Sequence, residues 1–119
     1  MRERDELFRE YYPYEIDPHI DPVQRDVYMT EWWERSMLLH ERYHLQRSHL
    51  DQIDYSRVVV REGWGEFLGY CHEQSIPVYI VSAGITQVIE RVLIHHGLYY
   101  DNITIISNTL EFDPDGNYV

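Results

Sequence analysis

A strand that runs into small polar residues is the part of this sequence best suited to bind an anion. The β-branched and aromatic run Val78–Val81 predicts a strand covered on both faces, and Ser82, Ala83 and Gly84 follow it. Apolar residues at helical spacing then predict a helix over 84–96. Because a helix N-terminus offers unpaired N–H groups and partial positive charge, the Ser82 hydroxyl and the next two N–H groups could hold a phosphate. A plain serine N-cap explains the same residues and stays open as an alternative.

A second pattern with possible chemistry is His40-Glu41-Arg42-Tyr43-His44. It matches H-E-x-x-H, in which two imidazoles one helical turn apart bind zinc and the glutamate activates water. The longer form of that motif requires a glycine and a third histidine, where this chain has Arg47 and Leu50. A zinc-dependent hydrolase and a solvated helix end are therefore both retained as interpretations.

Two aspartates near the C-terminus, Asp113 and Asp115, precede a glycine and resemble the D-x-D-G nucleophile loop of haloacid-dehalogenase-like phosphatases. That loop follows a buried apolar strand, whereas residues 108–112 alternate like a half-exposed strand. An Asp-Gly pair also suits a hairpin turn. We therefore predict a hairpin over 110–119 with its turn at 113–116.

An aromatic pair on a predicted helix offers a surface for a nucleobase. Trp32 and Trp33 share an apolar stripe with Ser36, and stacking rings beside a hydroxyl would form one wall of a base-binding site. Glu15, among tyrosines, could accept hydrogen bonds from the exocyclic amines of a base. Core packing of the tryptophans and solvation of the glutamate are the simpler alternatives.

The elements that would carry these residues follow from periodicity and breakers. Pro13 predicts the end of a short N-terminal helix, and residues 11–22 are expected to be extended. The remaining predicted elements are helices over 22–44, 49–60 and 64–74 and a strand over 103–107. We expect a helical cap segment over 1–60 and part of a doubly wound α/β core over 61–119.

Composition limits the classes of function. The 119 residues carry a net charge of −11 without a basic patch, which argues against nucleic acid or an anionic membrane as the partner. A single cysteine, Cys71, and the lack of a long apolar run favour a cytoplasmic setting. All ten basic residues are arginine, so no mechanism that needs a lysine ammonium is available to this chain alone.

Five segments in order resemble the cytosolic 5′-nucleotidase III family, the pyrimidine and 7-methylguanosine-phosphate 5′-nucleotidases of the haloacid-dehalogenase-like superfamily. The matching segments are Y-Y-P-Y-E-I-D-P-H at 11–19, M-T-E-W-W-x-x-S at 29–36, R-E-G-W at 61–64, S-I-P-V-Y-I-V-S-A-G-I at 75–85 and I-S-N-T-L-E-F-D-P-D-G at 106–116. The resemblance implies an α/β fold, a partial Rossmannoid domain with a helical cap insertion. It also implies a monomeric, Mg²⁺-dependent phosphatase that hydrolyses nucleoside 5′-monophosphates through an aspartyl-phosphate intermediate.

The same resemblance assigns roles to individual residues. Ser82 and Ala83, with Gly84, match the family's phosphate-binding turn, and Glu15 and Ser36 match its base-recognition positions. Trp33 falls where an aromatic side chain stacks on the base, and a tryptophan there would favour cationic 7-methylguanine.

The resemblance also implies that catalytic and metal-binding parts are missing. The nucleophile loop of this family precedes the cap, and its catalytic lysine and metal-binding aspartate follow the last segment matched here. No catalytic residue and no Mg²⁺ ligand is therefore assigned in this chain, which we expect to be a fragment without activity of its own. A non-catalytic interaction module remains the further alternative.

Overall fold

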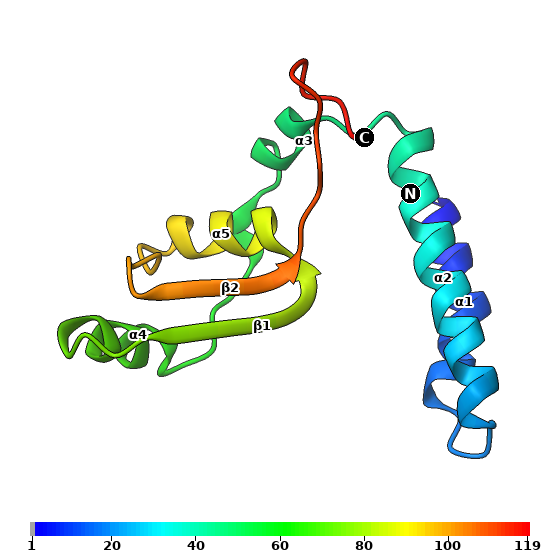
Figure 1. Cartoon of the computed structure of the whole chain (residues 1–119), viewed down its shortest axis with the longest axis horizontal. Coiled ribbons are helices and arrows are strands. Elements are labelled where there is room, and N and C mark those ends of the chain that lie inside the picture. Colours follow the sequence, from blue (N-terminus) through cyan, green and yellow to red (C-terminus); the bar gives the residue numbers. More distant parts are fainter. Residues whose placement is uncertain (1) are drawn as a thin grey trace. The chain divides into compact units, whose positions relative to one another are not determined.

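The computed structural model describes residues 2–119, which form two compact units (Figure 1). The first comprises the residues up to Leu45 together with Tyr118, and the second comprises Gln46–Asn117 together with Val119. By compactness the boundary thus lies after Leu45, whereas the assignment of residues 1–60 to a cap and 61–119 to a core stays a prediction. No helix among the described residues is long and apolar enough to cross a membrane.

The first unit is a pair of helices, α1 (Arg2–Ile16) and α2 (Pro22–Arg42). The prediction that Pro13 ends the first helix was wrong, because α1 continues through it for three more residues. A proline inside a helix removes one backbone hydrogen bond and crowds the preceding turn. Aromatic packing holds the turn in place: Tyr11 lies parallel to Trp32, and Tyr14 stacks on Tyr28 with ring centroids 4.0 Å apart.

Helix α2 begins and ends close to where the sequence predicts. The Asp21 carboxylate accepts hydrogen bonds from the backbone N–H groups of Val23 and Gln24, at 3.0 and 3.1 Å, and Pro22 occupies the first helical position. Both features are typical of a helix start. The helix ends at Arg42, two residues short of the predicted end.

The second unit is built on two parallel strands, β1 (Val78–Ile85) and β2 (Ile103–Asn108), in the order of strand, helix, strand. Helix α5 (Thr86–His95) connects them, and α4 (Trp64–Glu73) precedes them. Leu68, Leu93 and Ile103 form the buried core, against which apolar residues of both strands pack. The predicted helix over 64–74 and strand over 103–107 are thereby confirmed.

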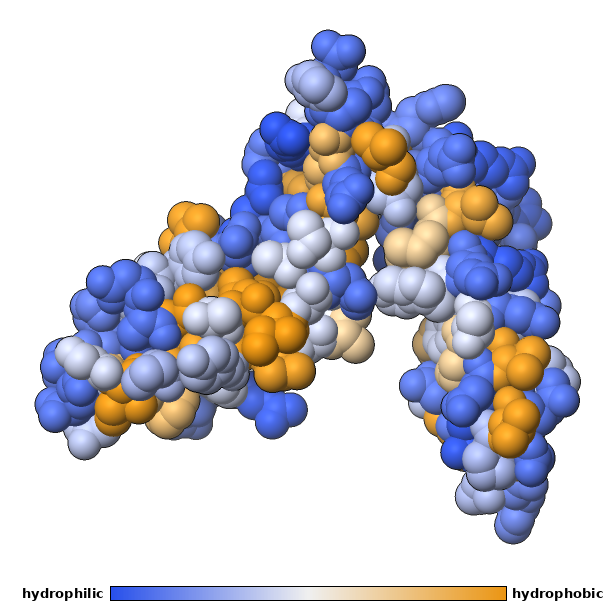
Figure 2. All heavy atoms as spheres, in the orientation of Figure 1, coloured by the Kyte–Doolittle hydropathy of each residue, from blue (hydrophilic) through white to orange (hydrophobic). Residues whose placement is uncertain are grey.

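One face of β1 is exposed, which differs from the prediction of a strand covered on both sides. Side chains alternate along it: Val78 and Ile80 pack on the core, whereas Tyr79 and Val81 are 64% and 76% exposed. The apolar run is typical of a strand between two layers, but within the described α/β unit the core packs on one face of β1. Figure 2 shows hydrophobic residues at the visible surface of both units.

The segment over 49–60 is not the helix that was predicted. It contains a short helix α3 (Arg47–Asp51) and one 3₁₀ turn, η1 (Tyr55–Arg57). The Asp54 carboxylate accepts from the backbone N–H of Ser56 at 3.2 Å, which starts the 3₁₀ turn and interrupts the helix.

The C-terminal hairpin is confirmed. Gly116 donates its backbone N–H to the Asp113 carbonyl at 2.9 Å and has a φ of 87°, a left-handed conformation that favours glycine. The N–H of Val119 pairs with the carbonyl of Glu111 at 3.0 Å across the turn.

Candidate functional site

Ser82, Ala83 and Gly84 lie at the end of β1, where pairing with β2 is irregular. The regular register ends at Val81, opposite Ile106, and pairing resumes only at Ile85, opposite Asn108. The helix predicted over 84–96 begins two residues later, since α5 starts at Thr86, and Ser82 is not its N-cap. Its N-cap residue, Ile85, is extended and has no capping side chain among the described residues. Ser82–Gly84 therefore form a bulge near the carboxyl end of β1, which we call the Ser82 turn.

Within the Ser82 turn, the serine hydroxyl is oriented by a local bond. The backbone N–H of Gly84 donates to Ser82 Oγ at 3.0 Å. The oxygen acts as an acceptor in this bond, so the hydroxyl proton can still be donated to an anion. A Cβ at position 84 would lie 3.2 Å from Ser82 Oγ, so glycine permits this close approach.

Two side chains at the end of β2 bind the carbonyl groups of the Ser82 turn. Ser107 Oγ donates to the Gly84 carbonyl at 2.7 Å, and Asn108 Nδ2 donates to the carbonyls of Ala83 and Gly84 at 2.9 and 3.3 Å. The sequence analysis did not assign these residues to the site. Their signal was available, because Ser107 ends the predicted strand over 103–107 and Asn108 follows it, and parallel strands end at the same edge of a sheet.

The start of α5 is joined to the segment after β2 by further side-chain bonds. The Gln87 amide donates to the Leu110 carbonyl at 2.6 Å and accepts from the Leu110 N–H at 3.1 Å. The Thr109 hydroxyl donates to Thr86 Oγ1 at 3.3 Å. These bonds hold the first turn of the helix next to the Ser82 turn.

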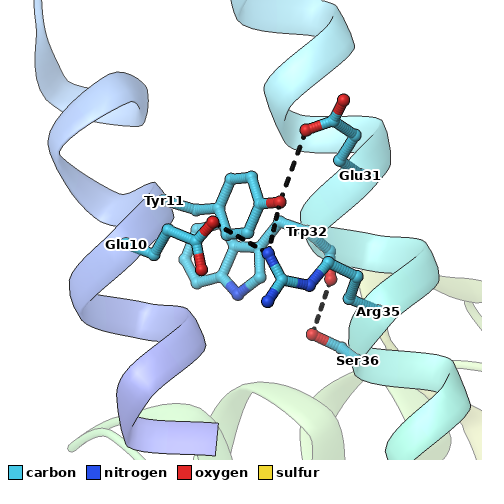
Figure 3. Close-up of polar contacts among 6 residues, drawn as sticks. All are labelled: Glu10, Tyr11, Glu31, Trp32, Arg35 and Ser36. Carbon is cyan, nitrogen blue, oxygen red and sulfur yellow. Dashed lines mark hydrogen bonds and ion pairs between the residues drawn. The ribbon is translucent and has the colours of Figure 1, made fainter.

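The helical unit contains a polar network around an aromatic pair (Figure 3). Tyr11 is buried, and its ring lies within 10° of parallel to that of Trp32, with centroids 6.2 Å apart. Its hydroxyl donates to Glu31 at 3.3 Å and accepts from Arg35 at 2.8 Å. Arg35 also pairs with Glu10 at 2.8 Å, so one cation joins the two helices.

The predicted base-recognition residues lie on this unit, Glu15 on α1 and Trp33 and Ser36 on α2. Trp33 is 45% exposed and Glu15 is exposed, so both are accessible to a ligand. Ser36 donates its hydroxyl proton to the Trp32 carbonyl at 2.7 Å, which leaves its oxygen as an acceptor.

The levels of Glu15 and Ser36 on the two antiparallel helices follow from the Tyr11–Trp32 pair (Figure 3). Glu15 comes four residues after Tyr11, and Ser36 comes four residues after Trp32 on a helix of opposite direction. At about 1.5 Å of rise per residue they lie about 12 Å apart along the helix axes. A ligand bound by both residues would extend past the aromatic pair.

The zinc-binding interpretation loses its geometric basis. Helix α2 ends before His44, whose φ of 51° is left-handed, so His40 and His44 do not stand one turn apart on a helix. Burial lowers the pKa of His40. Residues 2–119 contain no group of three or more histidine, cysteine, aspartate or glutamate side chains placed to hold a metal ion.

The Asp113 carboxylate serves the hairpin turn. Its two oxygens accept from the backbone N–H and the side-chain amide of Asn117, at 2.8 and 3.1 Å. The bond from the backbone N–H of Asn117 lowers the pKa of Asp113, and the bond from its side chain adds to this effect. This confirms the turn as the explanation of the D-x-D-G pattern.

Fold and site together define the chain as part of a haloacid-dehalogenase-like α/β domain with a helical insertion. Comparison with known proteins agrees: the profile of the pyrimidine 5′-nucleotidase (UMPH-1) family matches residues 1–119. The chain therefore belongs to the pyrimidine 5′-nucleotidase family.

Individual relatives show the same relationship. The chain is 34% identical to 7-methylguanosine phosphate-specific 5′-nucleotidases from Gallus gallus and Mus musculus, over 93% and 97% of its length. It also superposes on the crystal structure of cytosolic 5′-nucleotidase IIIB bound to cytidine, with a TM-score of 0.81 and 31% identity over 98% of the chain. The chain spans 39% of the length of each of these three proteins.

Proposed function

We propose that this chain binds a nucleoside 5′-monophosphate and holds its phosphate at the Ser82 turn. The observation that carries the proposal is the bond from the Gly84 N–H to Ser82 Oγ, which fixes the oxygen and leaves the hydroxyl proton for a phosphate oxygen. The site lies at the carboxyl end of a parallel strand and before a helix N-terminus, where ligands of open α/β sheets bind. The names of two similar proteins, 7-methylguanosine phosphate-specific 5′-nucleotidases, support the same ligand class.

The helical unit is proposed to recognise the base. The exposed ring of Trp33 offers a stacking surface, and the free acceptor positions of Ser36 and Glu15 suit the amino and ring N–H groups of a base. We propose 7-methylguanosine monophosphate as the preferred ligand, because its cationic ring gains cation–π attraction from a tryptophan face. A pyrimidine nucleotide is the competing ligand, supported by the family's description and by the cytidine complex of the similar structure.

Hydrolysis to nucleoside and phosphate is proposed for the family enzyme, in the cytoplasm and with Mg²⁺. The metal would neutralise charge on the transferring phosphoryl group. The described residues of this chain do not fit a Mg²⁺ site, since no three candidate ligands gather in them. Separately, the sequence contains no lysine that could act as the family's catalytic lysine. We accordingly derive no metal-dependent step and propose that this chain binds nucleotide without turnover.

Calorimetric titration of the purified chain with 7-methylguanosine monophosphate, with cytidine monophosphate as the competitor, tests this proposal. Ser82→Ala removes one hydrogen bond to a charged phosphate and should weaken binding about tenfold. Ser48→Ala, an exposed serine in α3, is the matched control and should bind as wild type does. Equal affinity of the Ser82 variant and wild type would contradict the proposed phosphate site. No binding by any form would favour a non-catalytic interaction module.

A further inference from the structure

We propose that Asn108 is a positioning residue: it binds the carbonyl groups of Ala83 and Gly84 and thereby sets the direction of the N–H groups of Gly84 and Ile85. This inference rests on the proposed phosphate site. Asn108 ends β2, and its side-chain amide donates to the carbonyls of Ala83 and Gly84 at 2.9 and 3.3 Å. Figure 1 shows β1 and β2 ending at the same edge of the sheet.

Peptide planarity connects the carbonyl bonds to the N–H groups. In a trans peptide the C=O and the following N–H point in opposite directions. Anchoring the Ala83 carbonyl toward Asn108 therefore turns the Gly84 N–H away from β2, where it meets Ser82 Oγ at 3.0 Å. Anchoring the Gly84 carbonyl likewise turns the N–H of Ile85 away from β2. One amide side chain thus fixes two consecutive peptide groups.

The backbone alone does not supply this restraint. Regular pairing of the two strands is interrupted between Val81 and Ile85, so backbone hydrogen bonds of regular strand pairing do not hold Ser82–Gly84 in place. The side chains of Ser107 and Asn108 take over, with three hydrogen bonds to two carbonyl groups. Because the Gly84 carbonyl accepts from both residues, loss of Ser107 alone leaves one of its bonds in place.

The opposite end of the same strand pair provides a matched control. Asn102 donates its side-chain amide to the Ile76 carbonyl at 2.7 Å, just before β1 and β2 begin. The two asparagines share residue type and kind of bond, although Asn102 is half-buried and Asn108 is exposed, and only Asn108 donates to the Ser82 turn. A role in strand pairing alone would give similar effects at both positions.

The experiment is a titration of the isotope-labelled full chain with inorganic phosphate, followed by amide NMR, for wild type, N108A, N108L and N102A. The leucine variant keeps the approximate size of asparagine and removes its donors. We expect N108A and N108L to weaken phosphate binding about tenfold, since two hydrogen bonds are lost, and N102A to bind within about twofold of wild type. Equal weakening by N108A and N102A, or wild-type affinity of N108L, would overturn the positioning role.

Hydrogen exchange of the Gly84 amide in the same samples separates this inference from the proposed function. We expect faster exchange in N108A and N108L but not in N102A, whether or not phosphate is present, because the bond to Ser82 Oγ depends on the anchored carbonyl. Absence of phosphate binding by wild type would contradict the phosphate site, while the exchange result would still decide the positioning role. Unchanged Gly84 exchange in both Asn108 variants would overturn it.

Discussion

The two units of this chain place candidate binding residues in opposite ways. In the helical unit no residue of α2 is buried among those described, and Trp33, Ser36 and Glu15 stand on helix surfaces. In the α/β unit the Ser82 turn is bound by side chains from the neighbouring strand, above a core that includes Leu68.

This difference indicates that the two surfaces suit different parts of a ligand. An open aromatic surface tolerates variation in a ring that stacks on it, since every base has a π-face. A turn with fixed N–H and hydroxyl directions suits one invariant group, such as a phosphate, because no reorganisation is needed on binding.

The largest effect is expected in the core of the α/β unit. Leu68 is only 1% exposed, and its truncation to alanine should cost about 2–5 kcal/mol of unfolding free energy through lost burial and a cavity. Leu38 of α2 is 59% exposed, and L38A should change stability by no more than about 0.5 kcal/mol. Urea denaturation followed by circular dichroism measures both variants, and equal losses would break the contrast between a buried core and an open helix surface.

A smaller effect is expected from the buried hydroxyl of the helical unit. Y11F keeps the ring beside Trp32 but removes the group that bonds Glu31 and Arg35, at a cost of about 1 kcal/mol. Y12F, outside this network, serves as the control. Thermal unfolding monitored by tryptophan fluorescence compares the two, and an unchanged midpoint for Y11F would show that the Tyr11 hydroxyl adds nothing to the ring packing and the Arg35–Glu10 ion pair that join the helices.

The smallest effect concerns the hairpin turn and its pH dependence. Hydrogen bonds from Asn117 hold the pKa of Asp113 below its ordinary value, so the folded state favours the ionised carboxylate. The resulting stabilisation is present above the unfolded-state pKa of about 4 and is lost as pH falls through the lower folded-state pKa. The Asn117 amide resonance should report this titration, and D113N should abolish it. A midpoint at or above about pH 4 would contradict the assignment.

Local patterns in the sequence predicted several elements well. The Asp21-Pro22 start of α2, the apolar spacing of α4 and the Asp-Gly hairpin turn each depend on neighbouring residues, and the structure confirms all three. The prediction of helix ends was wrong where contacts with residues distant in the sequence determine the local structure. Stacking of Tyr11 and Tyr14 on α2 stabilises the first helix beyond Pro13. Residues 11–16 alone do not reveal this stacking.

The candidate site was predicted in part. Residue types identified Ser82 and its neighbours as an anion-binding turn, but placed the helix start too early, because resumed pairing of Ile85 with Asn108 extends the strand. The polar residues at the end of the second strand indicated this edge of the sheet, but which carbonyl groups Asn108 binds depends on contacts between strands more than twenty positions apart in the chain. The roles of Glu15, Trp33 and Ser36 remain predictions.

Amide NMR of the wild-type chain during titration with 7-methylguanosine monophosphate tests the central claim most directly. The account predicts saturable shifts of the Ala83 and Gly84 amides. Shifts confined to other residues, or no saturable shift at Ala83 and Gly84, would contradict it.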